Sequence, residues 1–196
     1  MFYVPTIPKW QGLHVLIVHI PIALLVVAPF LVLLAVVIPP YRRGIAVSTL
    51  VLLVIGTLGA WLATATGGAA AHAAFHNPAY HTQQIREAIH HHADLGETTR
   101  DVFTVLSILF FVMLMVPVIK PAWAKTKVVV PALLVFFVLC IPGMWLMADT
   151  GDAGGMLVHK YGLKADVFPK SASLTADKGN SSSKGEHHTD SDGDGD

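Results

Sequence analysis

Four long stretches of the chain are almost entirely hydrophobic, and polar residues gather in the segments between them. The stretches cover residues 13–38, 45–65, 102–119 and 128–148, and none of them contains Asp, Glu, Lys or Arg. About 20 apolar residues in a helix are enough to cross a bilayer. Inside lipid the backbone polar groups must be satisfied within the segment, which favours helices. The pattern therefore predicts an all-α integral membrane protein with a bundle of four transmembrane helices.

Composition supports this prediction and excludes several other classes of protein. The chain of 196 residues is 54% hydrophobic and 13% charged, whereas soluble domains contain roughly 25% charged residues. Its formal net charge is zero, and without a basic patch it has no electrostatic footprint for nucleic acid. The single cysteine, Cys140, excludes an internal disulfide framework, a CxxC redox pair and CxxCH haem attachment.

The end of the chain differs in composition from the rest. Residues 170–196 consist mainly of Ser, Gly, Lys and Asp with almost no apolar residue, which is typical of disordered segments. We therefore predict a transmembrane domain over residues 1–169 and a disordered acidic tail over residues 170–196.

The charges in the two short connections predict the orientation of the helices. Residues 39–44 contain two arginines and no acid, and residues 120–127 contain three lysines and no acid. Short loops rich in Lys and Arg face the cytoplasm. Both termini and the histidine-rich segment 66–101 are then expected on the outer, periplasmic side of a multi-pass protein of the bacterial inner membrane.

Histidine carries the candidate chemistry, because the chain contains eleven histidines and all of them fall on the predicted outer side. Two imidazoles on facing transmembrane helices are the usual way to hold a b-type haem in a bundle. His19 lies deeper in the first span than His14 and is therefore the stronger ligand candidate on that helix. Together with His92, ahead of the third span, it is predicted to provide the axial ligands of the haem iron. His14 and His91 are predicted as a second pair or as donors around it.

Two further interpretations of the histidines stay open. A zinc or copper site needs three or four ligands, and a metal-handling protein for Zn, Cu or Fe could use His72, His76, Glu87 and His90. Alternatively, the histidines only donate hydrogen bonds in a structural anchor subunit of a larger complex. No phosphate-binding loop or nucleophile-and-base motif occurs, so no catalytic residue is predicted.

The segment after the fourth stretch is predicted to return over the histidine-rich side. Residues 149–155 are rich in Gly and Asp and are expected to form a turn, after which residues 158–168 fold back. His159 on this segment is a further candidate for cofactor binding.

Three short motifs resemble those of the bacterial membrane family catalogued as domain of unknown function 2231. Residues 13–25 read LHVLIVHIPIALL, with a His, four residues, a second His, an apolar residue and Pro. Residues 92–96 read HADLG, similar to the family's His-x-x-Leu-Gly. Residues 150–162 read TGDAGGMLVHKYG, similar to its closing Gly-Gly-x-Leu-Val-Tyr-x-His-Gly, although here His159 precedes Tyr161.

The resemblance implies a four-helix membrane protein of a kind sometimes fused to Rieske iron–sulphur domains or encoded near cytochromes. Together with the histidines it suggests an electron-transfer subunit that binds haem b and is not a stand-alone enzyme. Such a subunit would link a quinone pool or redox complex to a periplasmic cytochrome or iron–sulphur protein, or to other subunits of a respiratory complex.

Overall fold

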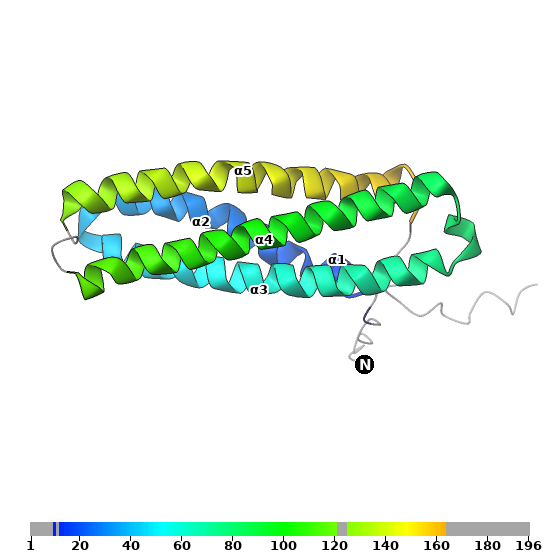
Figure 1. The fold of residues 1–196 in the computed structure, drawn as a ribbon, viewed down its shortest axis with the longest axis horizontal. Coiled ribbons are helices and arrows are strands. Elements are labelled where there is room, and N and C mark those ends of the chain that lie inside the picture. Colours follow the sequence, from blue (N-terminus) through cyan, green and yellow to red (C-terminus); the bar gives the residue numbers. More distant parts are fainter. Residues whose placement is uncertain (1–9, 11, 121–124, 164–196) are drawn as a thin grey trace, which may run out of the picture.

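The computed structural model describes residues 10, 12–120 and 125–163, which form four long helices packed side by side (Figure 1). The first consists of a short α1 (His14–Ile17) and α2 (His19–Val37). After the 3₁₀ turn η1 (Pro39–Tyr41), α3 runs over Arg42–Phe75. A second turn, η2 (Pro78–Tyr80), leads to α4 (Gln83–Ile119), and α5 covers Thr126–His159.

All four predicted spans are confirmed as helices that are long and apolar enough to cross a membrane. The outward faces of these helices carry many exposed large hydrophobic side chains, such as Leu58, Val105, Ile108 and Val138. Exposed apolar surface on this scale marks contact with a membrane or a partner. The predicted tail, residues 170–196, lies outside the described residues.

Two helices extend further than the sequence pattern suggested. Residues 66–75, expected in the loop after the second span, continue α3, and residues 149–155, expected to turn, lie within α5. Small residues continue a helix when packing against neighbouring helices supports it. The turn after α5 comes later than predicted, at Gly162, which has a φ of +68°. The N–H of Leu163 then donates to the carbonyl of Leu157 (3.0 Å). Residues 164–168 of the predicted return lie outside the described residues.

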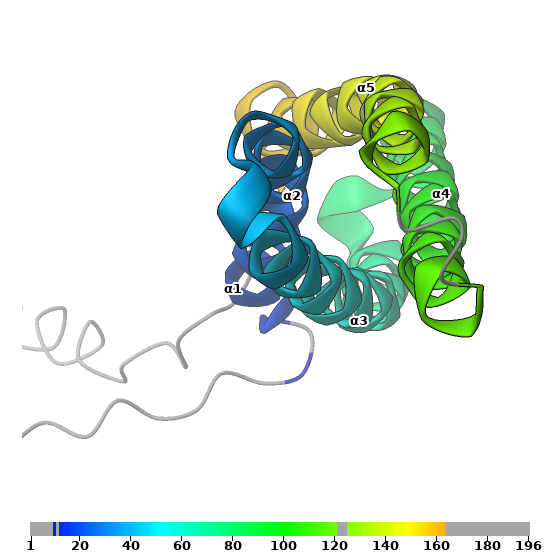
Figure 2. The same ribbon diagram turned by 90° about the vertical axis from the view of Figure 1, so that its left-hand side faces the viewer.

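The four helices stand at the corners of a bundle, in the order α2, α3, α4, α5 (Figure 2). Helix α2 therefore lies diagonally opposite α4, and α3 lies diagonally opposite α5. We call the end formed by α1, the α3–α4 connection and the last turns of α5 the histidine end. The opposite end, with Arg42, Arg43 and Lys120, is the basic end.

The apolar core runs along the axis of the bundle and holds the helices in register. Phe103, Phe110 and Phe136 are its largest fully buried side chains, and the rings of Phe110 and Phe136 lie 4.7 Å apart. Polar contacts join α3 to α4 within this core: the hydroxyls of Thr57 and Ser107 lie 2.8 Å apart, and each lies 3.3 Å from a backbone carbonyl of the other helix.

The closest approach of α2 and α3 gives a stability prediction. A Cβ built on Gly56 would lie 2.6 Å from Cδ2 of Leu25, which is fully buried. Gly56→Ala is expected to destabilise the protein by about 1–3 kcal/mol, as overpacking does. Gly44, with nothing within 4 Å of its Cβ position, is the matched control, and Gly44→Ala should stabilise the helix by about 0.5–1 kcal/mol. Chemical denaturation in detergent measures both, and equal stability of the two variants would contradict this packing.

Candidate functional site

The histidine end brings together two imidazole rings from diagonally opposite helices. His14 at the start of α1 and His92 on α4 are both half-buried. Their ring centroids lie 6.2 Å apart and their planes are inclined by 80°. The two residues are far apart in the sequence, so only the packing of the four helices creates this pair.

A break in the first helix accompanies the placement of His14. Pro21 has no N–H to donate to the carbonyl of Ile17 four residues earlier, and the helix is interrupted at Val18, between α1 and α2. His14 thereby belongs to a separate short helix that packs against α3.

A backbone carbonyl of α3 holds the His14 ring. Nδ1 of His14 lies 2.9 Å from the Ala63 carbonyl oxygen, and the Thr66 hydroxyl lies 3.5 Å from the same nitrogen. A carbonyl can only accept, so Nδ1 carries the proton and donates it. Nε2 of the neutral ring is then the nitrogen with a free lone pair.

A carbonyl of α5 holds the His92 ring in the same way. Nδ1 of His92 donates to the Thr150 carbonyl oxygen at 3.1 Å, which again leaves the lone pair on Nε2. The Thr150 hydroxyl lies 2.9 Å from the Thr99 hydroxyl of α4, so a side-chain contact fixes the two helices at this level.

Both rings rest against glycines, which leave room for them. A Cβ on Gly67 would lie 3.0 Å from Cε1 of His14, and a Cβ on Gly154 would lie 3.0 Å from Cε1 of His92. Any larger residue at either position would press on the ring. The neighbouring Gly68 and Gly155 have nothing within 4 Å of their Cβ positions, so the need for glycine is confined to the two that face the rings.

The separation of the two rings is compatible with two imidazole ligands of one metal ion. With metal–nitrogen bonds of about 2.0 Å and the radius of each ring added, the centroids of two such imidazoles lie about 6 Å apart, close to the 6.2 Å between His14 and His92. In the part of the chain that the structure describes, no group of three or more His, Cys, Asp or Glu side chains is placed to hold a metal. The protein therefore offers this site two ligands.

The structure does not bring His19 to His92. The His19 side chain is exposed on α2, whereas His14 occupies the position next to His92. Five residues separate His14 from His19 and turn them to different sides of a helix, so only one of them can face the bundle. The structure brings His14 together with His92, whereas the sequence had paired His92 with His19 and His14 with His91.

The residues of the predicted alternative metal site lie near the tip of the histidine end but do not converge. The rings of His72 and His76 lie tilted against each other with centroids 4.4 Å apart, and the His90 ring stacks on Phe75 at 5.3 Å. Glu87 accepts a hydrogen bond from Gln83 at 2.8 Å. The two remaining candidates, His91 and His159, are exposed.

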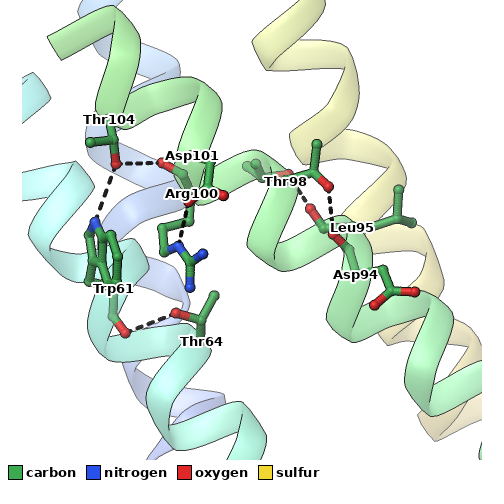
Figure 3. A network of polar contacts seen from close by, with 9 residues as sticks. Trp61, Thr64, Asp94, Leu95, Thr98, Arg100, Asp101 and Thr104 are labelled. Carbon is green, nitrogen blue, oxygen red and sulfur yellow. Dashed lines mark hydrogen bonds and ion pairs between the residues drawn. The ribbon is translucent and has the colours of Figure 1, made fainter. Parts of the chain in front are cut away.

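A group of polar residues joins α3 to α4 on the side of the histidine pair nearer the basic end (Figure 3). The Arg100 guanidinium lies over the Trp61 ring, 4.2 Å from its centroid, and donates to Asp101 at 2.8 Å. Trp61 Nε1 donates to the Thr104 hydroxyl at 3.2 Å. Aromatic and basic side chains of this kind are typical of the boundary between membrane and water.

Sequence reasoning missed the residues that position the two rings, namely Ala63, Gly67, Thr150 and Gly154. A backbone carbonyl has no signature in a sequence, since every residue has one. The signal that could have identified the glycines is the pair of Gly-Gly dipeptides at residues 67–68 and 154–155.

Comparison with known proteins adds no assignment: no family model, no curated protein and no solved structure matches the chain. The resemblance to domain of unknown function 2231 therefore stays a prediction.

Proposed function

We propose that this protein is a membrane electron-transfer subunit that binds one b-type haem between His14 and His92. The observation that carries the proposal is the pair of opposed imidazoles, each with Nδ1 hydrogen-bonded to a carbonyl and Nε2 left as the lone-pair nitrogen. An iron in haem receives four nitrogens from the macrocycle and needs only two axial ligands from the protein.

The number of ligands favours haem over a free metal ion. Zinc and copper sites are built from three or four protein ligands, whereas the described residues bring two histidines together here. The rings that would serve as axial ligands are held closely against neighbouring helices, because a Cβ on Gly67 or Gly154 would lie 3.0 Å from a ring atom.

The protein residues of this site have separable tasks. His14 and His92 would ligate the iron, and the carbonyls of Ala63 and Thr150 fix the orientation of the rings and increase the basicity of the coordinating nitrogens. Gly67 allows the His14 ring to approach α3 closely, and Gly154 allows the His92 ring to approach α5 closely. Haem, when bound, supplies the one-electron chemistry.

The position of the pair along the bundle suggests exchange of electrons with a partner at the membrane surface. About 20 residues of helix cross the hydrocarbon core, and counting that far from the basic end leads to Trp61 on α3 and Arg100 on α4. His92 precedes Arg100 by eight residues, or about 12 Å of helix. The haem would thus lie outside the apolar layer, on the histidine-end side of Trp61 and Arg100.

We further propose that the basic end faces the cytoplasm of a bacterium and the histidine end faces the periplasm, following the positive-inside rule. On this orientation a haem held by His14 and His92 would supply one-electron transfer between a quinone pool or a membrane redox complex and a periplasmic cytochrome or iron–sulphur protein.

The test is a reduced-minus-oxidised absorbance spectrum of the full chain, purified in detergent after expression with ample haem. We expect the sharp α band of a low-spin b-type cytochrome with two histidine ligands, in a ratio of one haem per chain. Metal analysis of the same sample serves as the control for zinc and copper. A flat spectrum from folded, helical protein would contradict the proposal.

A further inference from the structure

Each half of the bundle contains the same two contacts between its first and second helices. In the first contact, a histidine ring of the first helix packs against a glycine of the second. In the other contact, a large buried apolar side chain of the first helix packs against another glycine of the second. On both helices this contact lies eleven residues closer to the basic end than the histidine contact. The four contacts are His14 with Gly67, His92 with Gly154, Leu25 with Gly56, and Phe103 with Gly143.

The two sets of contacts are related by constant spacings. On the first helices, His92 and Phe103 follow His14 and Leu25 by 78 positions. On the second helices the spacing from one glycine to its counterpart is 87 positions. The carbonyls that accept from the two histidines obey the second spacing as well, because Thr150 follows Ala63 by 87 positions.

Burial repeats with the same spacings over the length of the helices. On α2 and α4, five of the six buried positions of α2 have a buried counterpart: residues 21, 25, 28, 29 and 32 match residues 99, 103, 106, 107 and 110, whereas Ala35 corresponds to the partly buried Met113. On α3 and α5 the buried residues 46, 49, 53, 56, 60 and 66 match the buried residues 133, 136, 140, 143, 147 and 153, whereas the buried residues 57, 59 and 63 correspond to the partly buried residues 144, 146 and 150. The same faces of corresponding helices therefore point into the core.

The arrangement of the helices fits a two-fold rotation. Both hairpins, α1–α2 with α3 and α4 with α5, begin at the histidine end and turn at the basic end. The first helices of the two hairpins are diagonal to one another, and so are the second helices (Figure 2). Half a turn about the long axis of the bundle exchanges one hairpin for the other.

We infer that residues 13–72 and 91–159 are two copies of one helical hairpin and that their two-fold axis passes between His14 and His92. The site then consists of two equivalent half-sites, each with one imidazole, one backbone carbonyl and one glycine. As a consequence that rests on the proposed function, His14 and His92 would hold a haem from two equivalent half-sites, so that the same kinds of protein group would meet it on either side.

Outward-facing residues do not follow the repeat, which is the expected result of constraint by packing. Trp61 corresponds to Ala148, and Leu58 corresponds to Trp145. Positions that face the core must preserve volume and close approach, whereas exposed positions are free to differ.

Distances between spin labels test the repeat without reference to haem. Cys140 is the only cysteine, so a Cys140→Ala background, or Cys140→Val if the first is unstable, allows labelling of the full chain at exposed sites. A two-fold axis requires that the distance in Phe30→Cys/Trp145→Cys equal the distance in Ile108→Cys/Leu58→Cys. Leu34→Cys/Trp145→Cys is the control, because its label is moved by about one turn and should give a different distance.

Paired ligand replacements test the equivalence of the half-sites. Methionine opposite histidine raises the potential of a haem, so His14→Met and His92→Met should give the same absorbance spectrum and the same upward shift in midpoint potential. Unequal spin-label distances in the two equivalent pairs would overturn the repeat. Equal distances with different potentials in the two methionine variants would overturn the equivalence of the half-sites. If the wild-type chain binds no haem, the proposed function fails while the spin-label distances still decide the repeat.

Discussion

Replacing either His14 or His92 with alanine is expected to abolish the low-spin haem spectrum of the protein. Each ring would supply one of the two axial bonds to the iron. Among the described residues, His14 and His92 are the pair of histidines from diagonally opposite helices whose rings lie close together, with centroids 6.2 Å apart. Even the partners that orient metal ligands contribute about 10–100-fold to metal affinity, so loss of a ligand itself should reduce bound haem at least tenfold. Absorbance spectra of the purified variants, normalised to protein, measure the loss.

The matched controls for this experiment are His19→Ala and His91→Ala. His19 begins α2 just after the short helix of His14, and His91 lies beside His92 on α4. Both side chains are exposed, so their removal should leave the spectrum unchanged. Circular dichroism of all four variants shows whether the helices remain intact. A protein that loses haem with His19→Ala but keeps it with His14→Ala would contradict the pairing described here.

Valine in place of Gly67 or Gly154 is expected to prevent haem binding almost as effectively, although neither glycine would touch the iron. A Cβ at either position would lie 3.0 Å from the Cε1 atom of a histidine, and that ring is fixed by its Nδ1 hydrogen bond. Overpacking of this kind costs about 1–3 kcal/mol, which corresponds to about 5–150-fold in affinity. Titration of the haem-free protein with haem measures the effect.

The adjacent glycines provide the controls for the valine variants. Gly68→Val and Gly155→Val place the same β-branched residue in the same helices, where nothing lies within 4 Å of the Cβ position. These two variants should bind haem with nearly wild-type affinity. Equal weakening in all four variants would mean that helix propensity, and not pressure on the rings, causes the loss.

The bundle could be predicted from the sequence because its elements depend on local properties. Four apolar stretches without a charge predict four helices by length and composition alone, and all four are present. The lengths of the helices were less predictable. Residues 66–75 and 149–155 are polar or rich in Gly and Ala, and their helical state depends on the neighbours that pack against them.

The ends of the bundle could also be assigned from the sequence, since the histidines and the basic residues fall in different connections. His92 was among the predicted ligands, and its ring now has a defined partner and a defined tautomer. The candidate metal set of His72, His76, Glu87 and His90 shows the opposite outcome. Spacing of four residues places side chains on one helix face, but it does not decide whether a second helix contributes the remaining ligands.

The sequence by itself determined that this protein has four helices suited to a membrane, a basic end and an end rich in histidine. Only the tertiary structure decided that His14, and not His19, meets His92. The choice depends on the interruption at Val18, on the register of α1 against α3 and on the close approach that Gly67 and Gly154 allow. These are contacts between segments distant in the chain, and neither hydropathy nor residue spacing within one helix specifies them.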